Sequence, residues 1–298
     1  MRKIHFLAIV VVAIWGYTFV TTKLLINQGL TPSQIMFFRF AIAYLCMLPL
    51  ARKPLFARNL RDELLTVGAG MAGGSLYFVA ENSAIAISFT SNVAIIIASA
   101  PILTQVASHF MLSDERMTRR MVSNSMLALA GVVLVIFNGQ MVLQLNPLGD
   151  LLALAASILW ALYTVLIRKL DSRGYSTSFV TRKIFFYGTA SMLPAFLFIP
   201  ITPSPPSMLL EASVYVPLLF LAVAASFFCF FAWGYVVEKI GATKSAPYIY
   251  LVPVISLISA AIFLDEQTTP LALAGMGLIL FGLLRGERHT PFSRMRKS

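Results

Sequence analysis

Long apolar stretches separated by short polar segments run through the whole chain. Many are about 20 residues long, the length at which a helix crosses the hydrocarbon core of a bilayer. The apolar runs and the Pro and Gly breakers between them predict ten helices, at residues 4–24, 33–51, 64–85, 90–112, 121–138, 148–167, 179–199, 214–235, 244–264 and 270–285. The pattern therefore predicts an all-α polytopic membrane protein with ten transmembrane helices.

Composition supports a membrane protein. Hydrophobic residues make up 58% of the chain and charged residues only 12%, whereas a soluble domain carries roughly 25% charged residues. The basic, apolar start MRKIHFLAIVVVAIWGYTFV is interpreted as the first membrane helix and not as a removed signal peptide, because many similar runs follow it. The two cysteines, Cys46 and Cys229, lie in apolar runs and are expected to be core residues.

The distribution of basic residues predicts the topology. With the N-terminus placed in the cytoplasm, only Lys23 and Arg39 of the 23 Lys and Arg residues fall on the outer side. Such asymmetry is typical of a correct topology, because basic residues concentrate in cytoplasmic segments. We therefore expect both termini in the cytoplasm of a bacterium and the protein in its inner membrane. This topology accounts for the net charge of +11, so we predict no nucleic-acid partner.

The two halves of the sequence resemble each other. Met-Leu-Pro occurs at 47–49 and again at 192–194, and Trp15 and Trp160 are also 145 residues apart. Further on, Pro101 and Pro253 match at a spacing of 152. The pattern predicts two repeats, residues 1–140 and 141–298, with five helices each. Because five is odd, the second repeat enters the membrane from the opposite side, an architecture that recurs in secondary transporters.

Two longer motifs carry a family resemblance. SNVAIIIASAPILTQVASHFMLSDE in the first half corresponds to KSAPYIYLVPVISLISAAIFLDE in the second, and LALAGVVLVIFNG to LALAGMGLILFG. With these motifs the chain resembles the EamA-type branch of the drug/metabolite transporter (DMT) superfamily over nearly its whole length. The resemblance implies export of metabolites or amino acids, a helix bundle around a central cavity, and a peripheral last helix in each repeat.

Two ionisable residues are predicted to lie within the bilayer, where charge is costly and often functional. Glu81 falls in the outer third of the third helix, and Arg39 lies about 9 Å into the second helix from the same side. We hypothesise that they form an outer gate or hold the ammonium and carboxylate of a zwitterion. Glu81 is also a candidate proton carrier, although a passive uniporter and a simple headgroup position for Glu81 remain alternatives.

Aromatic and hydroxyl residues are candidates for the wall of the solute site, which is usually apolar with a few placed polar groups. Trp15 and Trp160 occupy equivalent positions in the two repeats, as do Thr18 and Tyr163. Tyr77 precedes Glu81 by one helical turn. The other candidates are Tyr187, Trp233, Tyr248 and Tyr250. For each aromatic residue, ordinary packing is the alternative.

The two matched prolines are predicted hinges. Pro101 and Pro253 fall inside the fourth and ninth predicted helices, where proline removes a backbone donor and frees the carbonyls of Ile97 and Ile249. Arg182 and Lys183 mirror Arg39 in the second repeat. Cytoplasmic anchoring explains these two residues, and an inner gate is the alternative.

No HExxH, GxSxG or P-loop motif and no metal-ligand cluster occurs, so we predict no cofactor, no metal and a transport cycle driven by gradients. The leading hypothesis is a secondary transporter, an exporter or facilitator of amino acids or related small amphipathic metabolites, that works by alternating access. Its partners would be the small-molecule solute and the lipid bilayer, with a co-transported proton and a monomeric state left open. The alternatives are a membrane-embedded lipid-modifying enzyme and a non-transporting membrane module.

Overall fold

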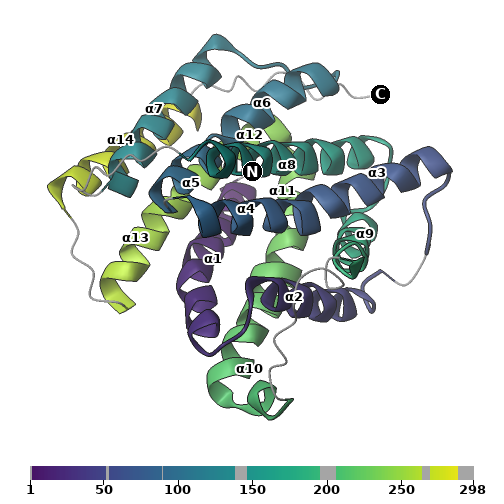
Figure 1. Cartoon of the computed structure of the whole chain (residues 1–298). Helices are drawn as coiled ribbons and strands as arrows, with labels where there is room; N and C mark the ends of the chain where they lie inside the picture. The colour runs from purple at the N-terminus through teal and green to yellow at the C-terminus, as the bar shows by residue number, and fades with distance from the viewer. Residues whose placement is uncertain are drawn as a thin grey trace.

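The computed structural model describes residues 2–51, 54–88, 90–137, 146–194, 206–263 and 269–287, and in these ranges it contains helices and turns without any strand (Figure 1). The helices of the first half are α1 (Arg2–Asn27), α2 (Pro32–Met47), α3 (Leu60–Gly70), η1 (Met71–Ser75), α4 (Leu76–Ile87), α5 (Thr90–Ile97), α6 (Ala100–Met111) and α7 (Arg119–Phe137). Those of the second half are α8 (Pro147–Ser172), α9 (Thr177–Ala190), η3 (Pro206–Leu210), α10 (Ala212–Leu219), η4 (Phe220–Phe228), α11 (Cys229–Ile240), α12 (Ala242–Ser245), η5 (Ala246–Tyr250), α13 (Leu251–Phe263) and α14 (Pro270–Glu287).

The protein is a multi-pass membrane protein by the length and apolarity of its helices. Five helical stretches are long and apolar enough to cross a bilayer: Leu60–Ala84, Val93–Met111, Arg119–Phe137, Pro147–Ser172 and Ala212–Ile240. Helix is also present within each of the other predicted ranges, with α9 ending at Ala190, earlier than predicted. That ten helices cross the membrane as two inverted repeats stays a prediction.

Local sequence signals account for several helix starts. Thr31 and Gln34 form a capping box at the start of α2, where Pro32 occupies the first turn. The Asn146 side chain accepts a hydrogen bond from the Gly149 amide at the start of α8. Asn59 caps α3 in the same way, which places the start of this helix before the predicted residue 64.

Irregular helix occurs at matching places in the two halves. The stretch α3–η1–α4 contains the π-helical turn Met71–Ser75, with Gly74 at φ −123° and ψ −106°, and α10–η4–α11 contains the π-helical stretch Phe220–Phe228. The next helix in each half is also interrupted, between α5 and α6 in the first and by the 3₁₀ turn η5 in the second. Such interruptions often mark functional positions, because the local backbone ladder is broken there.

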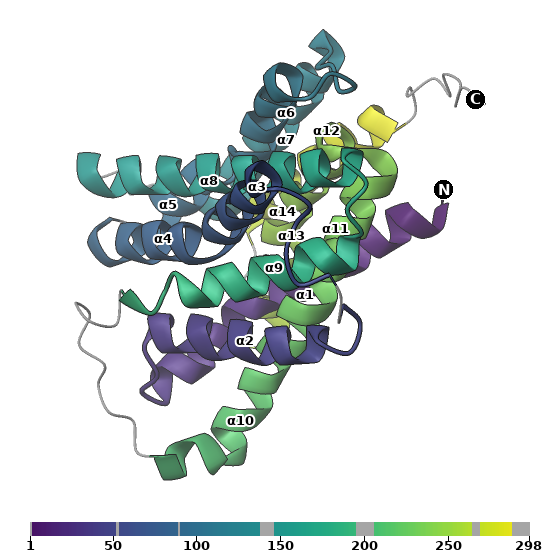
Figure 2. The ribbon, with the colours of Figure 1, turned by 90° about the vertical axis from the view of Figure 1, so that its right-hand side faces the viewer.

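Helices from the two halves pack between one another. Figures 1 and 2 show α8 beside α4, and these elements are in contact. Gly70 and Gly74 allow α9 to approach closely, since a Cβ on Gly74 would lie 3.1 Å from the Gly188 Cα. The helices α7 and α14 pack together at one edge of the molecule, where a Cβ on Gly131 would lie 2.6 Å from the Gly275 carbonyl oxygen.

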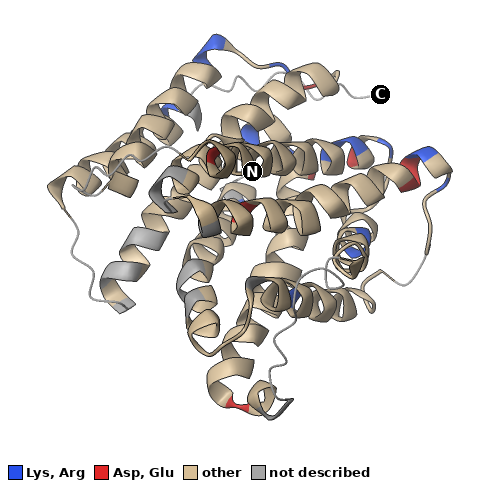
Figure 3. Ribbon diagram, in the orientation of Figure 1, with Lys and Arg blue, Asp and Glu red and all other residues tan. Residues whose placement is uncertain are grey.

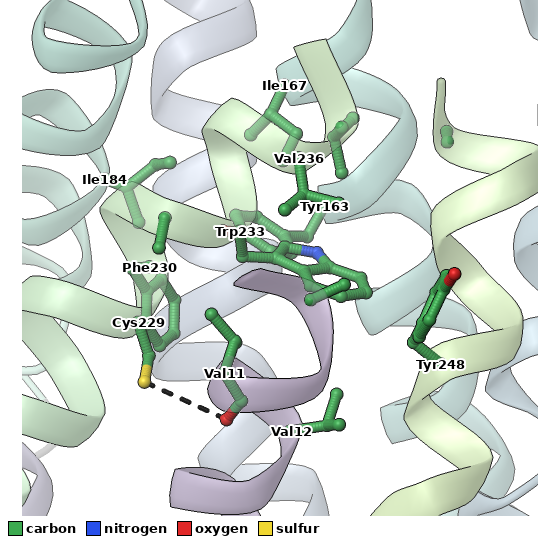
Figure 4. Close-up of a cluster of buried hydrophobic side chains, with 14 of the residues drawn as sticks. Val11, Val12, Tyr163, Ile167, Ile184, Cys229, Phe230, Trp233, Val236 and Tyr248 are labelled. Atoms are coloured by element: carbon green, nitrogen blue, oxygen red, sulfur yellow. Dashed lines mark hydrogen bonds between the residues drawn. The ribbon is translucent and has the colours of Figure 1, made fainter. Parts of the chain in front are cut away.

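The main core lies where α1, α8, α9 and α11 meet. Trp233 is fully buried and Tyr163 is 1% exposed, and Figure 4 shows both rings among Phe230, Val236 and Ile167. The Cys229 thiol donates to the Val11 carbonyl at 3.9 Å (Figure 4). Cys229 is therefore a core residue, as predicted, whereas Cys46 is only half-buried.

Candidate functional site

The tryptophans that match between the two halves of the sequence are in direct contact. Trp15 on α1 and Trp160 on α8 meet edge to face, with ring centroids 5.5 Å apart and an interplanar angle of 84°. Both rings are half-buried. The indole nitrogen of Trp15 donates to the Ala225 carbonyl at 3.0 Å, which fixes the ring against η4. The structure thus joins the two halves through an aromatic pair.

Further aromatic rings extend this contact in both directions. Trp160 lies 5.6 Å from Tyr77 on α4 and 5.3 Å from Tyr163 on α8, measured between ring centroids. Trp15 lies 5.4 Å from Trp233 and 6.0 Å from Phe230 on α11. We call the six residues Trp15, Tyr77, Trp160, Tyr163, Phe230 and Trp233 the aromatic cluster. It offers a broad apolar surface with the half-buried rings at one side and the buried rings at the other.

A carboxyl group lies beside the aromatic cluster. The Tyr77 hydroxyl donates to Glu81 Oε1 at 3.0 Å, across one turn of α4. Glu81 is half-buried and lies in the otherwise apolar sequence of α4. The hydrogen bond orients the carboxyl group toward the edge of the cluster, so that an apolar surface and an acceptor lie next to each other.

Arg39 brings a positive charge into the same region. It is 7% exposed, and its Nε donates to the Ser226 hydroxyl on η4 at 2.8 Å. Its guanidinium carbon lies 5.4 Å from the centroid of the Phe78 ring. The π-helical stretch η4 thus supplies both Ser226 for Arg39 and the Ala225 carbonyl for Trp15.

Arg39 and Glu81 each have another partner in this conformation. No nitrogen–oxygen distance within 4.0 Å joins these two described residues. The outer gate predicted from the sequence is therefore not closed by a direct ion pair here.

The remaining aromatic and hydroxyl candidates are spread through the molecule. Thr18 donates to the Trp15 carbonyl at 2.6 Å and so stays within its own helix. Tyr248 shares a hydrogen bond with His5 Nδ1 at 2.6 Å, near the start of α1. Tyr250 is 1% exposed and belongs to the core. Tyr187 donates to Glu63, which lies at the beginning of α3, whereas Glu81 lies on α4.

Both predicted hinge prolines follow a change of helix type. Pro101 lies in the first turn of α6, directly after the break at Ala98 and Ser99. Pro253 lies near the start of α13, directly after the 3₁₀ turn η5. Each interruption thus lies a few residues before its proline, beside the carbonyls of Ile97 and Ile249 that the prolines were predicted to free. At the first break, the Ile96 carbonyl accepts from the Ser157 hydroxyl of α8 at 2.9 Å.

A group of charged residues lies at one end of the bundle, where α3 begins, α8 ends and α9 lies, while other charges are seen at the starts of α7, α8 and α10 (Figure 3). Glu115, which is 8% exposed, accepts from the amides of Ala242 and Thr243 at 2.8 and 2.6 Å and from Arg168 Nε at 3.1 Å. It therefore caps α12 in the other half of the chain. We call this end of the bundle the charged end; it carries the segments predicted to be cytoplasmic.

A small pocket lies between the aromatic cluster and the charged end, with room for about one water molecule. Its lining residues are Tyr163, Ile167, Asp171, Tyr175, Thr177, Val180, Thr181, Ile184, Phe230 and Gly234. Above this pocket the Thr177 hydroxyl donates to Glu238 Oε2 at 2.5 Å, across from α9 to α11.

Several residues of the site carry no obvious signal in the sequence. Phe230, Phe78 and Ser226 are apolar or small residues in apolar runs, and only their contacts distinguish them. Glu63 lies one residue before the predicted start of the third helix at residue 64. Asn59 followed three residues later by Asp62 is a helix start signal that places Glu63 in the first turn of α3. Among the described residues, no group of three or more His, Cys, Asp or Glu side chains is arranged to hold a metal ion.

Comparisons with known proteins agree with the family resemblance found in the sequence. The profile of the EamA-like transporter family matches residues 2–137 and 147–285. An "Uncharacterized transporter" of Archaeoglobus fulgidus is 28% identical over 273 residues, which are 89% of this chain and 90% of that protein. A "Probable amino-acid metabolite efflux pump" of Salmonella typhimurium is 27% identical over 298 residues, covering 95% of this chain and 94% of that protein.

A solved crystal structure of a protein has the same fold. It superposes with a TM-score of 0.77 at 18% identity, over 96% of this chain and 98% of that chain. At this identity the likeness concerns the fold alone.

Proposed function

The chain belongs to the EamA-like transporter family, and from this premise we propose that it is a secondary transporter that moves amino acids or related small amphipathic metabolites by alternating access. The observation that carries the proposal is the site around Glu81. A carboxyl group held by Tyr77 at 3.0 Å and the buried Arg39 lie beside the Trp15–Trp160 pair. This combination of acceptor, cation and aromatic surface suits a solute with an ammonium, a carboxylate and an apolar part.

The architecture we propose is ten transmembrane helices in two inverted repeats, residues 1–140 and 141–298, with both termini in the cytoplasm and the protein in a bacterial inner membrane. The paired irregular helices support it: π-helical turns in Met71–Ser75 and Phe220–Phe228, and interruptions before Pro101 and Pro253. Discontinuous helices at corresponding positions of two repeats are typical of transporter binding sites. The two prolines are proposed hinges.

The solute class rests on the site and on one relative. The Salmonella typhimurium protein of similar sequence is named an amino-acid metabolite efflux pump, and the charged and aromatic groups of the site are complementary to amino acids. We further propose that Glu81 carries a proton during the cycle. A passive uniporter uses the same site without this step, and the experiment below separates the two.

The test is efflux from liposomes that contain the purified full-length protein and a mixed pool of amino acids and metabolites. We expect selective efflux that responds to a pH gradient in the wild type and loses this response in Glu81→Gln. Asp150→Asn is the control, because Asp150 accepts from Ser88 at 3.1 Å at the other side of the same α4–α8 interface and lies away from the aromatic cluster. Efflux indifferent to the gradient would leave a uniporter, and no efflux of any pool member would contradict the proposed function.

A further inference from the structure

A second charged group with the composition of the Glu81 site lies at the charged end. Glu63 in the first turn of α3 forms an ion pair with Lys183 of α9 and accepts a hydrogen bond from the Tyr187 hydroxyl. Its other oxygen accepts from the Ala57 amide at 2.6 Å. The Lys183 ammonium lies 4.7 Å from the centroid of the Phe56 ring and 5.1 Å from that of Tyr187. An ammonium group is thus enclosed by a carboxylate and aromatic faces.

Anchoring at the membrane surface does not explain Lys183. An anchoring lysine extends its ammonium into water at the interface, but the Lys183 side chain is 5% exposed and that of Glu63 only 15%. Removing two charges from water is costly, so a buried ion pair is weak support for stability. A replacement by apolar residues would build a simpler helix contact. The buried charges therefore call for a function.

The two charged groups are composed of the same kinds of side chain. Each contains a carboxylate, a tyrosine that donates to it, and a basic side chain over an aromatic ring: Glu81, Tyr77 and Arg39 over Phe78 in one group, and Glu63, Tyr187 and Lys183 over Tyr187 and Phe56 in the other. Arg39 and Lys183 are 144 residues apart, within one residue of the spacing of the tryptophan pair. They therefore lie on the corresponding helices α2 and α9, one residue out of register with each other.

Both carboxylates belong to one helical stretch, α3–η1–α4. They are 18 residues apart, which equals about five turns of a regular α-helix. Between them lies the π-helical turn Met71–Ser75, where Gly74 leaves helical geometry. A bend at this turn would move the two carboxylates relative to each other without breaking either half of the stretch.

The groups differ in how they are occupied. Lys183 is bound directly to Glu63, whereas Arg39 is bound to Ser226 and Glu81 to Tyr77. From this difference we infer that Glu63, Tyr187 and Lys183 form a second, inner solute site for a compound with both an ammonium and a carboxylate group, and that Lys183 occupies the ammonium position while the site is empty. When a solute enters, its ammonium replaces Lys183 on Glu63, and the released Lys183 binds the solute carboxylate.

This inference rests on the proposed transport function and adds a site on the other side of the protein. It explains why the cation beside Glu63 is a lysine. A flexible ammonium can move between two partners as a point charge, whereas the planar guanidinium of Arg39 is held in one orientation by Ser226 and Phe78.

The test compares the two sides of the protein in membrane vesicles of known orientation that contain the full-length chain. The probe is the amino acid that the wild type transports fastest from an equimolar mixture of the common L-amino acids. We expect Glu63→Gln to raise its half-saturating concentration about 10-fold from the charged end and to leave the other side nearly unchanged, because a hydrogen-bonded charge partner is lost there. Glu81→Gln is expected to show the opposite preference.

Two further variants keep the result interpretable. Tyr187→Phe removes one hydroxyl and little else. We therefore expect a smaller increase in the half-saturating concentration from the charged end, which can be measured even where Glu63→Gln folds poorly. Asp114→Asn changes a carboxylate at the charged end that is 51% exposed and paired with Arg168, and it should alter neither side. Methyl esterification of the probe should weaken binding at the charged end less in Lys183→Met than in the wild type.

The outcomes separate the two proposals. Transport by the wild type with no side-specific effect of Glu63→Gln and Tyr187→Phe would overturn the inner site and leave the proposed function intact. Equal effects of these variants from both sides would also overturn it, since they would indicate a role in the fold. Absence of transport by the wild type would overturn the proposed function and the inner site together.

Discussion

Tyr77 and Glu81, one helical turn apart on α4, are joined by a hydrogen bond of 3.0 Å from the phenol to the carboxyl group. The same Tyr77 ring contacts Trp160, with centroids 5.6 Å apart. Tyr77 therefore links the polar part of the site to its aromatic surface. A change at Tyr77 that keeps the ring and removes the hydroxyl isolates the polar link.

We predict that Tyr77→Phe lowers the transport efficiency about 10-fold, because a hydrogen bond to a charged group contributes about 1.5–3 kcal/mol while the ring contact is retained. Initial efflux rates from proteoliposomes measure the effect. Tyr215→Phe is the matched control, since Tyr215 is 42% exposed on α10 and lies outside the aromatic cluster. Equal rates for the two variants would show that the Tyr77 hydroxyl has no part in transport.

The packing between η1 and α8 allows a second prediction. A Cβ on Gly73 would lie 2.6 Å from Cγ of Tyr163, a residue that is only 1% exposed. Gly73→Ala should therefore destabilise the protein by about 1–3 kcal/mol, the usual cost of overpacking. Thermal unfolding in detergent measures it. Gly277→Ala is the control because nothing lies within 4 Å of its added methyl group; a similar loss in both would argue against the contact.

The adjacent carboxylates at the end of α6 should differ in their importance for stability. Glu115 is 8% exposed and bonded to Arg168 and to the start of α12, whereas Asp114 is 51% exposed. We expect Glu115→Ala to lower the free energy of unfolding by about 3 kcal/mol, since it leaves a half-buried cation and two amides without their partner. Asp114→Ala should cost about 0–1 kcal/mol.

Titration with a denaturing detergent, followed by loss of helix signal, compares the two variants of this carboxylate pair. If Glu115→Ala proved as stable as Asp114→Ala, the capping of α12 by the first half of the chain would contribute little to the stability of the fold.

The contact between Trp15 and Trp160 can be measured by a double-mutant cycle. Edge-to-face rings with centroids 5.5 Å apart are expected to contribute about 0.5–1.5 kcal/mol beyond their burial. The variants Trp15→Leu, Trp160→Leu and their combination should therefore be non-additive in unfolding free energy by that amount. A cycle on Trp15 and Phe186, an exposed ring on α9 outside the cluster, should be additive within about 0.5 kcal/mol.

Much of the organisation could be predicted because the bilayer constrains it so strongly. A membrane-spanning helix needs a long apolar run, so the helical, multi-pass character is visible in the residue pattern itself. The topology drawn from the basic residues stays a prediction. The internal match of Trp15 with Trp160 pointed to two related residues, and the structure brings their rings together. The family resemblance drawn from the repeated motifs is confirmed by the match over residues 2–137 and 147–285.

Partners across helices were beyond reach of the sequence. Matching depths in the membrane made a contact between Arg39 and Glu81 possible, but depth does not fix the direction of a side chain around the helix axis. The structure directs Arg39 to Ser226 on η4 and Glu81 to Tyr77. Ser226 is one of many small residues in an apolar run, and only packing distinguishes it.

The sequence by itself determined that this is a polytopic helical membrane protein whose two halves are similar in sequence, because hydropathy and internal similarity are properties of single positions and their spacing. The tertiary structure alone decided which side chains meet. In the structure Lys183 forms an ion pair with Glu63, whereas Arg39 and Glu81 have separate partners. These contacts depend on the rotation of each helix about its axis and on the π-helical turns at Met71–Ser75 and Phe220–Phe228. Both arise only when all helices pack together.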